Sequence, residues 1–273
     1  MNDEWAYPVT VEEMYGEWDY EAAVEALDRS LSPRRGTSLF DTVASVGVGD
    51  QDTLLDIGGR EGQDALAMAE RFGCRAVCVD PVAANLERGA DLVAQHDSAH
   101  LVELRLGSIE HIPAADGEFT MIYSRDMLGH VNDLGRALAE CARVLRPNGH
   151  MVIHEVFGTA LLEPQEKALV CDYTATVPER LSVPVFETTV AAGAFSIESV
   201  DVVGSEFTEF NQEAGKVPNY LLQVSRLRRA KDQLVAELGE VPYRVMYGNA
   251  LWSIYRLIGK LETRVYVLRR SGE

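Results

Sequence analysis

The chain has 273 residues, of which 43 are acidic and 25 basic, so its formal net charge is −18, and 47% of its residues are apolar. This length accommodates about one or two domains. The apolar fraction is sufficient for a full core and excludes a disordered chain. Because nucleic acids and anionic membrane surfaces are themselves negative, the charge disfavours both as binding partners.

Targeting and metal signals are missing from the sequence. No apolar run approaches the roughly 20 residues of a transmembrane helix, and the N-terminal MNDEWAYPVT lacks the order of a signal peptide. The four cysteines are too few for a disulfide framework, and no His/Cys cluster points to a metal. The sequence therefore predicts a cytoplasmic protein that binds no metal and acts on small molecules.

The chain is predicted to begin with helices. Residues 10–30 have helical character, with Thr10 as N-cap and Glu13 completing a capping box. Pro33 ends this segment, and a second helix is predicted to end at Gly47. From residue 53 short apolar runs alternate with amphipathic segments, which indicates βαβ units and a parallel sheet. The predicted strands are Thr53–Ile57, Ala76–Val79, Leu101–Leu106, Phe119–Tyr123 and His150–Val156, and the predicted helices are Gln63–Arg71, Ala83–Gln95 and Leu134–Leu145.

After Val156 the alternation stops. Residues 158–190 contain three prolines and are expected to be irregular. A strand is predicted at Ile197–Val203, a helical region at roughly Asn219–Leu238 and Tyr243–Lys260, and a last strand at Arg264–Leu268. The prediction is an α/β fold with a doubly wound, mostly parallel sheet whose last two strands form an antiparallel edge hairpin around a helical insertion.

Ligands bind to doubly wound sheets at the carboxyl ends of the strands. The first strand is followed by the glycine-rich segment 56–62 (DIGGREG), in which glycines allow a ligand to approach the backbone and the next helix offers free N–H groups. Asp80 follows the second strand and is placed to accept hydrogen bonds from two ribose hydroxyls. The glycine spacing differs from the G-x-G-x-x-G of dinucleotide sites. Together these features indicate a nucleoside ligand.

These motifs resemble those of the class I S-adenosylmethionine-dependent methyltransferases. The resemblance rests on LLDIGGREG, VCVDPVAANLERG, LRLGSIEHIPAADGEFTMIYSRDMLGHVND and RVLRPNGHMVIHE, which follow one another within residues 36–157. The tail IGKLETRVYVLRR is similar to the last helix and strand of small-molecule members. The resemblance implies S-adenosyl-L-methionine as cofactor and a Rossmann-like methyltransferase fold. It also implies an N-terminal helical lid (1–35), a cofactor-binding core (36–157), a cap or insertion (158–195) and C-terminal strands with a helical insertion (196–273).

The resemblance assigns the cofactor contacts residue by residue. Arg60 stands where many members carry glycine, and its guanidinium is suited to the methionyl carboxylate. Ser108 stands where many carry an aspartate, which removes a charged hydrogen bond of about 1.5–3 kcal/mol to the adenine. The implied cofactor residues are Asp56, Gly58, Gly59, Arg60 and Gly62 in the first turn, Asp80 and Pro81 after the second strand, Ser108 and Ile109 at the adenine, and Ser124 and Asp126 after the fourth strand.

Three residues are candidate catalytic bases. His130 follows the fourth strand, and histidine titrates close to neutral pH. His154 and Glu155 end the fifth strand, where they point to opposite faces, so only one of them is expected to reach the pocket. The alternatives are a solvated or capping role for His130 and a core role for His154.

Aromatic residues outside the nucleoside core are expected to line the acceptor pocket, which favours an apolar, ring-containing acceptor. The alternative is that these aromatic residues belong to the core, because apolar residues at helical spacing form one buried face of a helix. Such a face is formed by Tyr247, Leu251, Ile254 and Ile258. The candidate substrate-binding residues are Tyr15, Trp18, Phe157, Tyr173, Tyr220 and Tyr247.

The sequence thus predicts a small-molecule methyltransferase that methylates oxygen in a biosynthetic pathway, as a monomer or homodimer. Methylation of nitrogen or carbon is an open alternative. Another is a protein that keeps the fold and binds the cofactor but acts as a cyclase-like enzyme or a non-catalytic partner, since Arg60 and Ser108 depart from the pattern. The charge and the lack of a basic stripe disfavour nucleic acid as the acceptor.

Overall fold

The computed structural model describes residues 8–16 and 18–272, and the chain divides into two units, residues 1–33 and 34–273. The N-terminal unit contains α1 (Val11–Met14) and α2 (Tyr20–Asp28). The predicted capping box is confirmed, because Glu13 N–H donates to Thr10 Oγ1 (3.2 Å) and Thr10 N–H to the Glu13 carboxylate (2.9 Å). The single helix predicted over 10–30 is wrong, since Asp19 caps a second helix by accepting from Ala22 N–H. Residues 1–7 of the predicted lid lie outside the described part.

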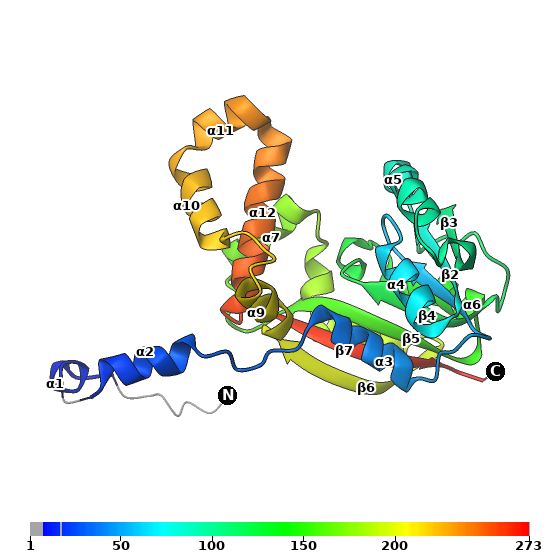
Figure 1. Cartoon of the computed structure of the whole chain (residues 1–273), viewed down its shortest axis with the longest axis horizontal. Coiled ribbons are helices and arrows are strands. Elements are labelled where there is room, and N and C mark those ends of the chain that lie inside the picture. Colours follow the sequence, from blue (N-terminus) through cyan, green and yellow to red (C-terminus); the bar gives the residue numbers. More distant parts are fainter. Residues whose placement is uncertain (1–7, 17, 273) are drawn as a thin grey trace. The chain divides into compact units, whose positions relative to one another are not determined.

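The second unit is built on a mixed sheet with strand order β3-β2-β1-β4-β5-β7-β6 (Figure 1). The strands β1 to β5 run parallel, whereas β7 is antiparallel to both β5 and β6. The predicted α/β fold and antiparallel hairpin are confirmed, with β7 inserted next to β5 so that β6 forms the edge. The strands are β1 (Thr53–Ile57), β2 (Arg75–Asp80), β3 (Val102–Leu106), β4 (Phe119–Arg125), β5 (Leu145–Gly158), β6 (Phe195–Gly204) and β7 (Leu261–Arg270).

Helices cover both faces of the sheet, because side chains alternate along each strand. On β5, Met151 and Ile153 pack into one core cluster, which α6 and α8 also enter, while Val152 packs into a second cluster with α3, α4 and α9. All four cysteines are buried free thiols. The helices named here are α3 (Leu39–Ser45), α4 (Gln63–Phe72), α6 (Leu134–Val144), α8 (Val183–Ala191) and α9 (Glu206–Glu213), and α5 (Ala83–Ala94) follows β2.

The segment 158–190, predicted to be irregular, is largely helical, so that prediction is wrong. Its prolines stand in first turns, where their missing N–H costs nothing and their φ suits a helix. Pro164 begins α7 (Pro164–Thr174), and Pro184 lies in the first turn of α8. The helix α9 was not predicted. The predicted helical region is confirmed as three helices, α10 (Tyr220–Arg229), α11 (Lys231–Leu238) and α12 (Glu240–Leu257), which lie together with α7 on one side of the sheet in Figure 1.

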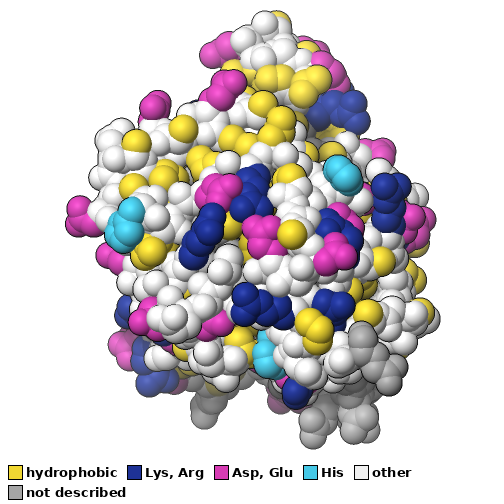
Figure 2. Space-filling view, turned by 90° about the vertical axis from the view of Figure 1, so that its right-hand side faces the viewer, with side chains coloured by type: hydrophobic (Ala, Val, Ile, Leu, Met, Phe, Trp, Pro, Cys, Tyr) yellow, Lys and Arg dark blue, Asp and Glu magenta, His cyan; other side chains and the backbone are white. Residues whose placement is uncertain are grey.

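Charges on the surface are mixed. On the face in Figure 2, basic and acidic side chains are interspersed and neither forms a continuous patch. Ion pairs such as Arg75–Glu103 and Arg143–Asp116, both 2.7 Å, match this distribution. None of the described helices combines the length and apolar character that a membrane crossing requires.

Candidate functional site

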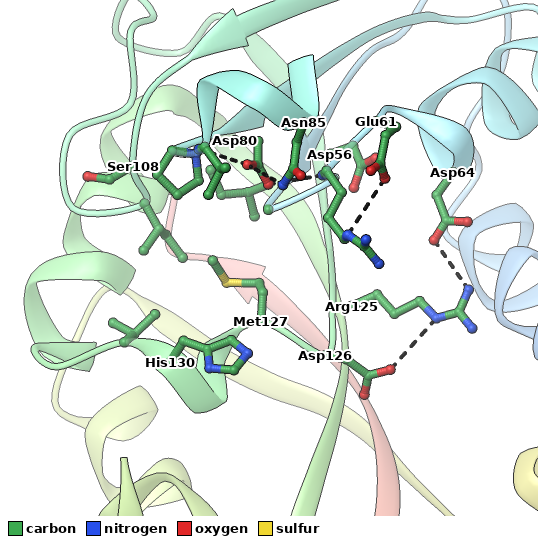
Figure 3. Close-up of a pocket in the computed structure, with 18 of the residues that line it drawn as sticks. Asp56, Glu61, Asp64, Asp80, Asn85, Ser108, Arg125, Asp126, Met127 and His130 are labelled. Atoms are coloured by element: carbon green, nitrogen blue, oxygen red, sulfur yellow. Dashed lines mark hydrogen bonds and ion pairs between the residues drawn. The ribbon is translucent and has the colours of Figure 1, made fainter. Parts of the chain in front are cut away.

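A cavity of about 770 Å³ lies at the carboxyl ends of β1, β2 and β4. Asp56, Asp80 and Ser108 lie along one side of this opening, and Met127 and His130 lie on the other (Figure 3). This is where parallel sheets of this kind bind ligands. The wall consists of Asp56, Ile57, Gly58, Gly59, Arg60, Glu61, Gln63, Asp64, Asp80, Pro81, Val82, Asn85, Ser108, Ile109, Glu110, Arg125, Asp126, Met127, His130 and Val131.

The turn after β1 requires glycine for two different reasons. Gly58 has a φ of +76°, and a Cβ there would lie 2.8 Å from Met127 Cγ. Gly59 has an ordinary φ, but a Cβ there would lie 2.2 Å from Asp56 Oδ2. The turn therefore brings backbone to the cavity at a distance that a side chain would prevent.

Gly62 and Arg60 complete this turn. Gly62 is the N-cap of α4 with a φ of +79°, so it shapes the turn, although it is not part of the cavity wall. Arg60 has a φ of +52°, a conformation that favours glycine. This explains why many class I methyltransferases carry glycine at the position of Arg60. Its side chain is 72% exposed and lies 3.6 Å from Glu61. The predicted pairing of Arg60 with the cofactor carboxylate stays a prediction.

Asp56 carries the unsatisfied polar atom of the site. The residue is 2% exposed, and its Oδ2 has no hydrogen-bond partner among the described residues. Burial, together with the carboxylate of Asp64, raises the pKa of Asp56 well above its usual range. A buried acceptor without a partner is costly. This oxygen is therefore suited to a ligand group that donates a hydrogen bond and carries a positive charge.

Asp80 links the turns after β1 and β2. Its Oδ2 accepts from Arg60 N–H (3.0 Å), while its Oδ1 accepts from Val82 N–H (2.9 Å) and from the Asn85 amide (3.0 Å). A carboxylate has about four acceptor positions. Asp80 thus shapes its own turn and keeps capacity for a ligand hydroxyl at the cavity wall.

The loop after β3 contributes a residue that sequence reasoning missed. Ser108 and Ile109 line the cavity as predicted, and Glu110 lies beside them. Glu110 belongs to the same wall as Ser108, and position 108 is the one at which many class I methyltransferases carry an aspartate. The signal in the sequence was an acidic residue two positions after Ser108.

Asp126 lies at the end of β4 with a φ of +51°. Its Oδ1 is 3.0 Å from His154 Nδ1, and its Oδ2 is 3.9 Å from the guanidinium of Arg125. Burial raises the pKa of Asp126, but the charges of His154, Arg256 and Arg125 outweigh burial and hold that pKa well below its usual range. An ionised carboxylate is therefore expected at this wall.

His154 and Ser124 are not part of the wall. His154 is 1% exposed and stacks on Phe207 at a ring distance of 5.4 Å. Ser124 is fully buried in β4, and its hydroxyl has no described partner. The expectation that Ser124 lines the pocket is wrong, because β4 directs this side chain between the layers. His154 is a core histidine, which was the alternative considered for it.

His130 lies on the wall, in the short helical turn η3 (Leu128–His130). Its Nδ1 is 3.0 Å from the carbonyl oxygen of Ala175. A carbonyl can only accept, so Nδ1 carries a proton, and in the neutral imidazole Nε2 is then the acceptor.

Glu155 is buried behind η3 and does not line the cavity. Burial and the charge of Asp126 raise the pKa of Glu155 to about 8. His154 and Glu155 do point to opposite faces of β5, but neither reaches the cavity, so the expectation that one of them contacts the ligand is wrong. Packing on both faces of β5 is the reason.

The aromatic residues predicted for an acceptor pocket lie elsewhere. Phe157 is fully buried and packs edge-on against Phe186 (5.5 Å) and Tyr266 (5.9 Å), so it belongs to the core. Tyr173 contacts Tyr247 at a ring distance of 6.1 Å, within the packing of α7 against α12.

Tyr220 packs against the same helical cluster, around Val170 and Leu251. The predicted substrate role of Phe157 is therefore corrected to a packing role. Tyr173, Tyr220 and Tyr247 are half-buried between helices, and their predicted contact with substrate stays a prediction. Tyr15 and Trp18 are exposed in the N-terminal unit, and their predicted contact with substrate stays a prediction.

The seven-stranded sheet with antiparallel β7, the glycine turn after β1 and the acid after β2 define the class I S-adenosylmethionine-dependent methyltransferase fold. Residues 55–153 match the family model described as a methyltransferase domain. Over these residues the chain is similar to methyltransferases, in agreement with the resemblance of its motifs.

Among curated proteins, the chain is similar to the 27-O-demethylrifamycin SV methyltransferase of Amycolatopsis mediterranei. The two are 27% identical over 82% of this chain and 73% of that protein. It is also similar to the glycine/sarcosine/dimethylglycine N-methyltransferase of Actinopolyspora halophila, at 26% identity over 46% of this chain. The matched part spans only 22% of that relative, and 38% and 28% of two further methyltransferases.

Two solved structures share the fold over 86% of this chain. Geranyl diphosphate C-methyltransferase from Streptomyces coelicolor aligns with a TM-score of 0.65 and 15% identity over 77% of its chain. The [4+2]-cyclase SpnF aligns with a TM-score of 0.66 and 19% identity over 80% of its chain. The fold therefore accommodates more than one chemistry.

Proposed function

We propose that this protein transfers a methyl group from S-adenosylmethionine to a small-molecule acceptor. The observation that carries the proposal is Asp56, a residue of the cavity wall whose Oδ2 is buried without a partner among the described residues, beside a turn in which glycines bring the backbone close to the cavity. The cofactor carries a methyl group on a sulfonium and an ammonium on its methionyl part. A buried carboxylate oxygen is the complement of that ammonium.

The remaining walls fit the other parts of the cofactor. Asp80 retains acceptor capacity for ribose hydroxyls, and it lies between the turns after β1 and β2. Ser108, Ile109 and Glu110 are assigned to the adenine, where the Glu110 carboxylate would supply the charged acceptor that serine does not provide. The departures at positions 60 and 108 are thereby accommodated within the same cavity.

His130 is proposed as the general base. Because its Nδ1–H is engaged by the Ala175 carbonyl, the Nε2 lone pair is available to take a proton from the acceptor. A hydroxyl must lose its proton to become an effective nucleophile, whereas a neutral amine attacks through its own lone pair. A base on this wall therefore favours oxygen as the methylated atom. The name of the rifamycin relative, which denotes transfer to oxygen, points the same way.

The acceptor is proposed to be apolar or ring-containing and to be bound beside Met127 and Val131, the apolar side chains on the His130 side of the cavity. The alternative, a cyclase-like or non-catalytic protein, rests on the departures at positions 60 and 108. Turnover distinguishes the two functions, because only a methyltransferase releases S-adenosylhomocysteine.

The test begins with calorimetric titration of the protein with S-adenosylmethionine and S-adenosylhomocysteine, followed by a screen of phenols and other hydroxyl compounds for release of S-adenosylhomocysteine. His130→Ala is expected to lower kcat by about 10²–10⁴ without changing cofactor affinity. His100→Ala, which removes a histidine outside the cavity wall, serves as matched control. Absence of cofactor binding would refute the function, and full turnover of His130→Ala would refute the assignment of the base.

A further inference from the structure

The turn that carries His130 is held from behind by a buried carboxyl group. Leu128 N–H donates to Glu155 Oε2 at 2.8 Å, and Val156 N–H donates to Glu155 Oε1 at 3.1 Å. The Gly129 amide adds a further hydrogen bond to the same carboxyl group. Glu155 therefore ties the end of β5 to the first two residues of η3.

The opposite side of the turn is held by residues 175–177, which follow α7. Val177 N–H donates to the Gly129 carbonyl at 2.8 Å, and the Ala175 carbonyl accepts from His130 Nδ1 at 3.0 Å. A Cβ at Gly129 would lie 3.6 Å from Thr176 Cγ2 and 3.7 Å from Glu155 Oε1. The turn is thus enclosed between Glu155 and this segment.

Glu155 is buried without an ion-pair partner among the described residues. It is 4% exposed, and no ion pair between described residues includes it. Burial of a carboxyl group without a cation is unfavourable, and hydrogen bonds to the group offset part of that cost. All the hydrogen bonds described for it go to the backbone at η3 and at its own strand.

We propose that Glu155 is a positioning residue that fixes η3 so that Nε2 of His130 faces the cavity. This inference rests on the proposed role of His130 and extends it to a residue outside the cavity wall. Because reacting groups must be held within a narrow geometry, a shift of about 1 Å in such a turn lowers turnover by about 10²-fold. The hydrogen bonds of Glu155 go to η3 and to β5 and not to Asp56, Asp80 or Ser108, so cofactor affinity is expected to remain unchanged.

The variant for this test is Glu155→Gln, which keeps the shape of the side chain but replaces one acceptor oxygen by a donor. Its control is Asp52→Asn, which changes a carboxylate that accepts from Gly49 N–H at 2.8 Å, beside the start of β1 and away from the cavity. Expected for Glu155→Gln is a kcat about 10–100-fold lower, with the same dissociation constant for S-adenosylmethionine. Asp52→Asn is expected to retain the wild-type kcat.

A second readout is independent of activity. In protein labelled with ¹⁵N-histidine, the His130 ring, assigned by its loss in His130→Asn, is expected to show a protonated Nδ1 and an unprotonated Nε2. In Glu155→Gln the two nitrogen signals are expected to move toward the average of both tautomers. An unchanged His130 spectrum in Glu155→Gln would overturn the positioning role, even if turnover falls.

A double variant separates this inference from the proposed base. If Glu155 acts through His130, Glu155→Gln lowers kcat no further in the His130→Ala background. An equal decrease in both backgrounds would overturn the inference while leaving the methyltransferase function intact. Full turnover of His130→Ala together with a shifted His130 spectrum in Glu155→Gln would instead refute the base and support the positioning.

Val177→Pro provides a second route if Glu155→Gln folds poorly. Residue 177 already has a φ of −73°, so proline suits this position and removes the N–H that holds the Gly129 carbonyl. The same change in the His130 spectrum is expected. A wild-type spectrum would contradict a turn held from both sides.

Discussion

Gly59 offers a strict test of the turn after β1, because its Cα faces the buried carboxyl group of Asp56. A Cβ at this position would lie 2.2 Å from Asp56 Oδ2 and 2.8 Å from Cys78 Sγ. Normal contacts between heavy atoms are about 3.5–4.0 Å. Neither neighbour can withdraw easily, since Cys78 is fully buried in β2 and the Asp56 carboxyl accepts from the Ala65 amide.

Gly59→Ala is therefore expected to lower the free energy of unfolding by about 1–3 kcal/mol, the range for overpacked buried sites. For a chain of this size each kcal/mol shifts Tm by roughly 2–4 °C, so Tm should fall by roughly 2–12 °C. The displaced carboxyl group also removes the oxygen assigned to the cofactor ammonium. Loss of one charged hydrogen bond, about 1.5–3 kcal/mol, lowers affinity by at least about tenfold.

Urea denaturation measures the first effect, and calorimetric titration with S-adenosylmethionine measures the second. Gly49→Ala is the matched control, because no heavy atom lies within 4 Å of the added Cβ. The control is expected to change neither quantity. Wild-type stability and affinity of Gly59→Ala would refute the packing argument, and loss of stability with wild-type affinity would refute the role of Asp56.

Three further outcomes are expected. Asp80→Ala weakens binding of S-adenosylmethionine by about 1–3 kcal/mol, measured by calorimetry, and unchanged affinity would contradict the ribose assignment. Burial raises the pKa of Glu155 to about 8 in the folded protein, against about 4.3 in the unfolded chain. Between these two values the folded state keeps a proton that the unfolded state loses. The free energy of unfolding therefore decreases from about pH 4 to about pH 8. Glu155→Gln should show a smaller decrease in denaturation curves across this range, and an equal slope would argue against a raised pKa. Phe157→Ala lowers the free energy of unfolding by about 3–5 kcal/mol, as expected of a core phenylalanine. A loss below about 1 kcal/mol would contradict its packing role in the core.

The parallel part of the sheet was predictable because its strands are short apolar runs separated by amphipathic segments. The residues between 158 and 190 were not, since proline both breaks helices and begins them. Pro164 and Pro184 stand in first turns, and only the packing of α7 and α8 against other elements distinguishes that role. Local sequence signals do not contain this information.

The site shows the same division. The turn 56–62, Asp80 and His130 were identified from sequence, because glycine conformation and the positions after strands are local properties. Strand alternation also predicted that His154 and Glu155 point to opposite faces. Which face meets a cavity depends on the layers packed around β5, and both faces are covered.

The sequence by itself thus determined the order of elements from β1 to β5, the class of fold and the nucleoside side of the cavity, because these follow from local periodicity and turn chemistry. Only the tertiary structure decided which buried polar groups remain without hydrogen-bond partners and which segments enclose the turn that carries His130. Asp56 Oδ2 is orphaned, and η3 lies between Glu155 and residues 175–177, because segments distant in sequence pack there. Burial and hydrogen bonding between such segments are properties of the packed chain, and no local pattern encodes them.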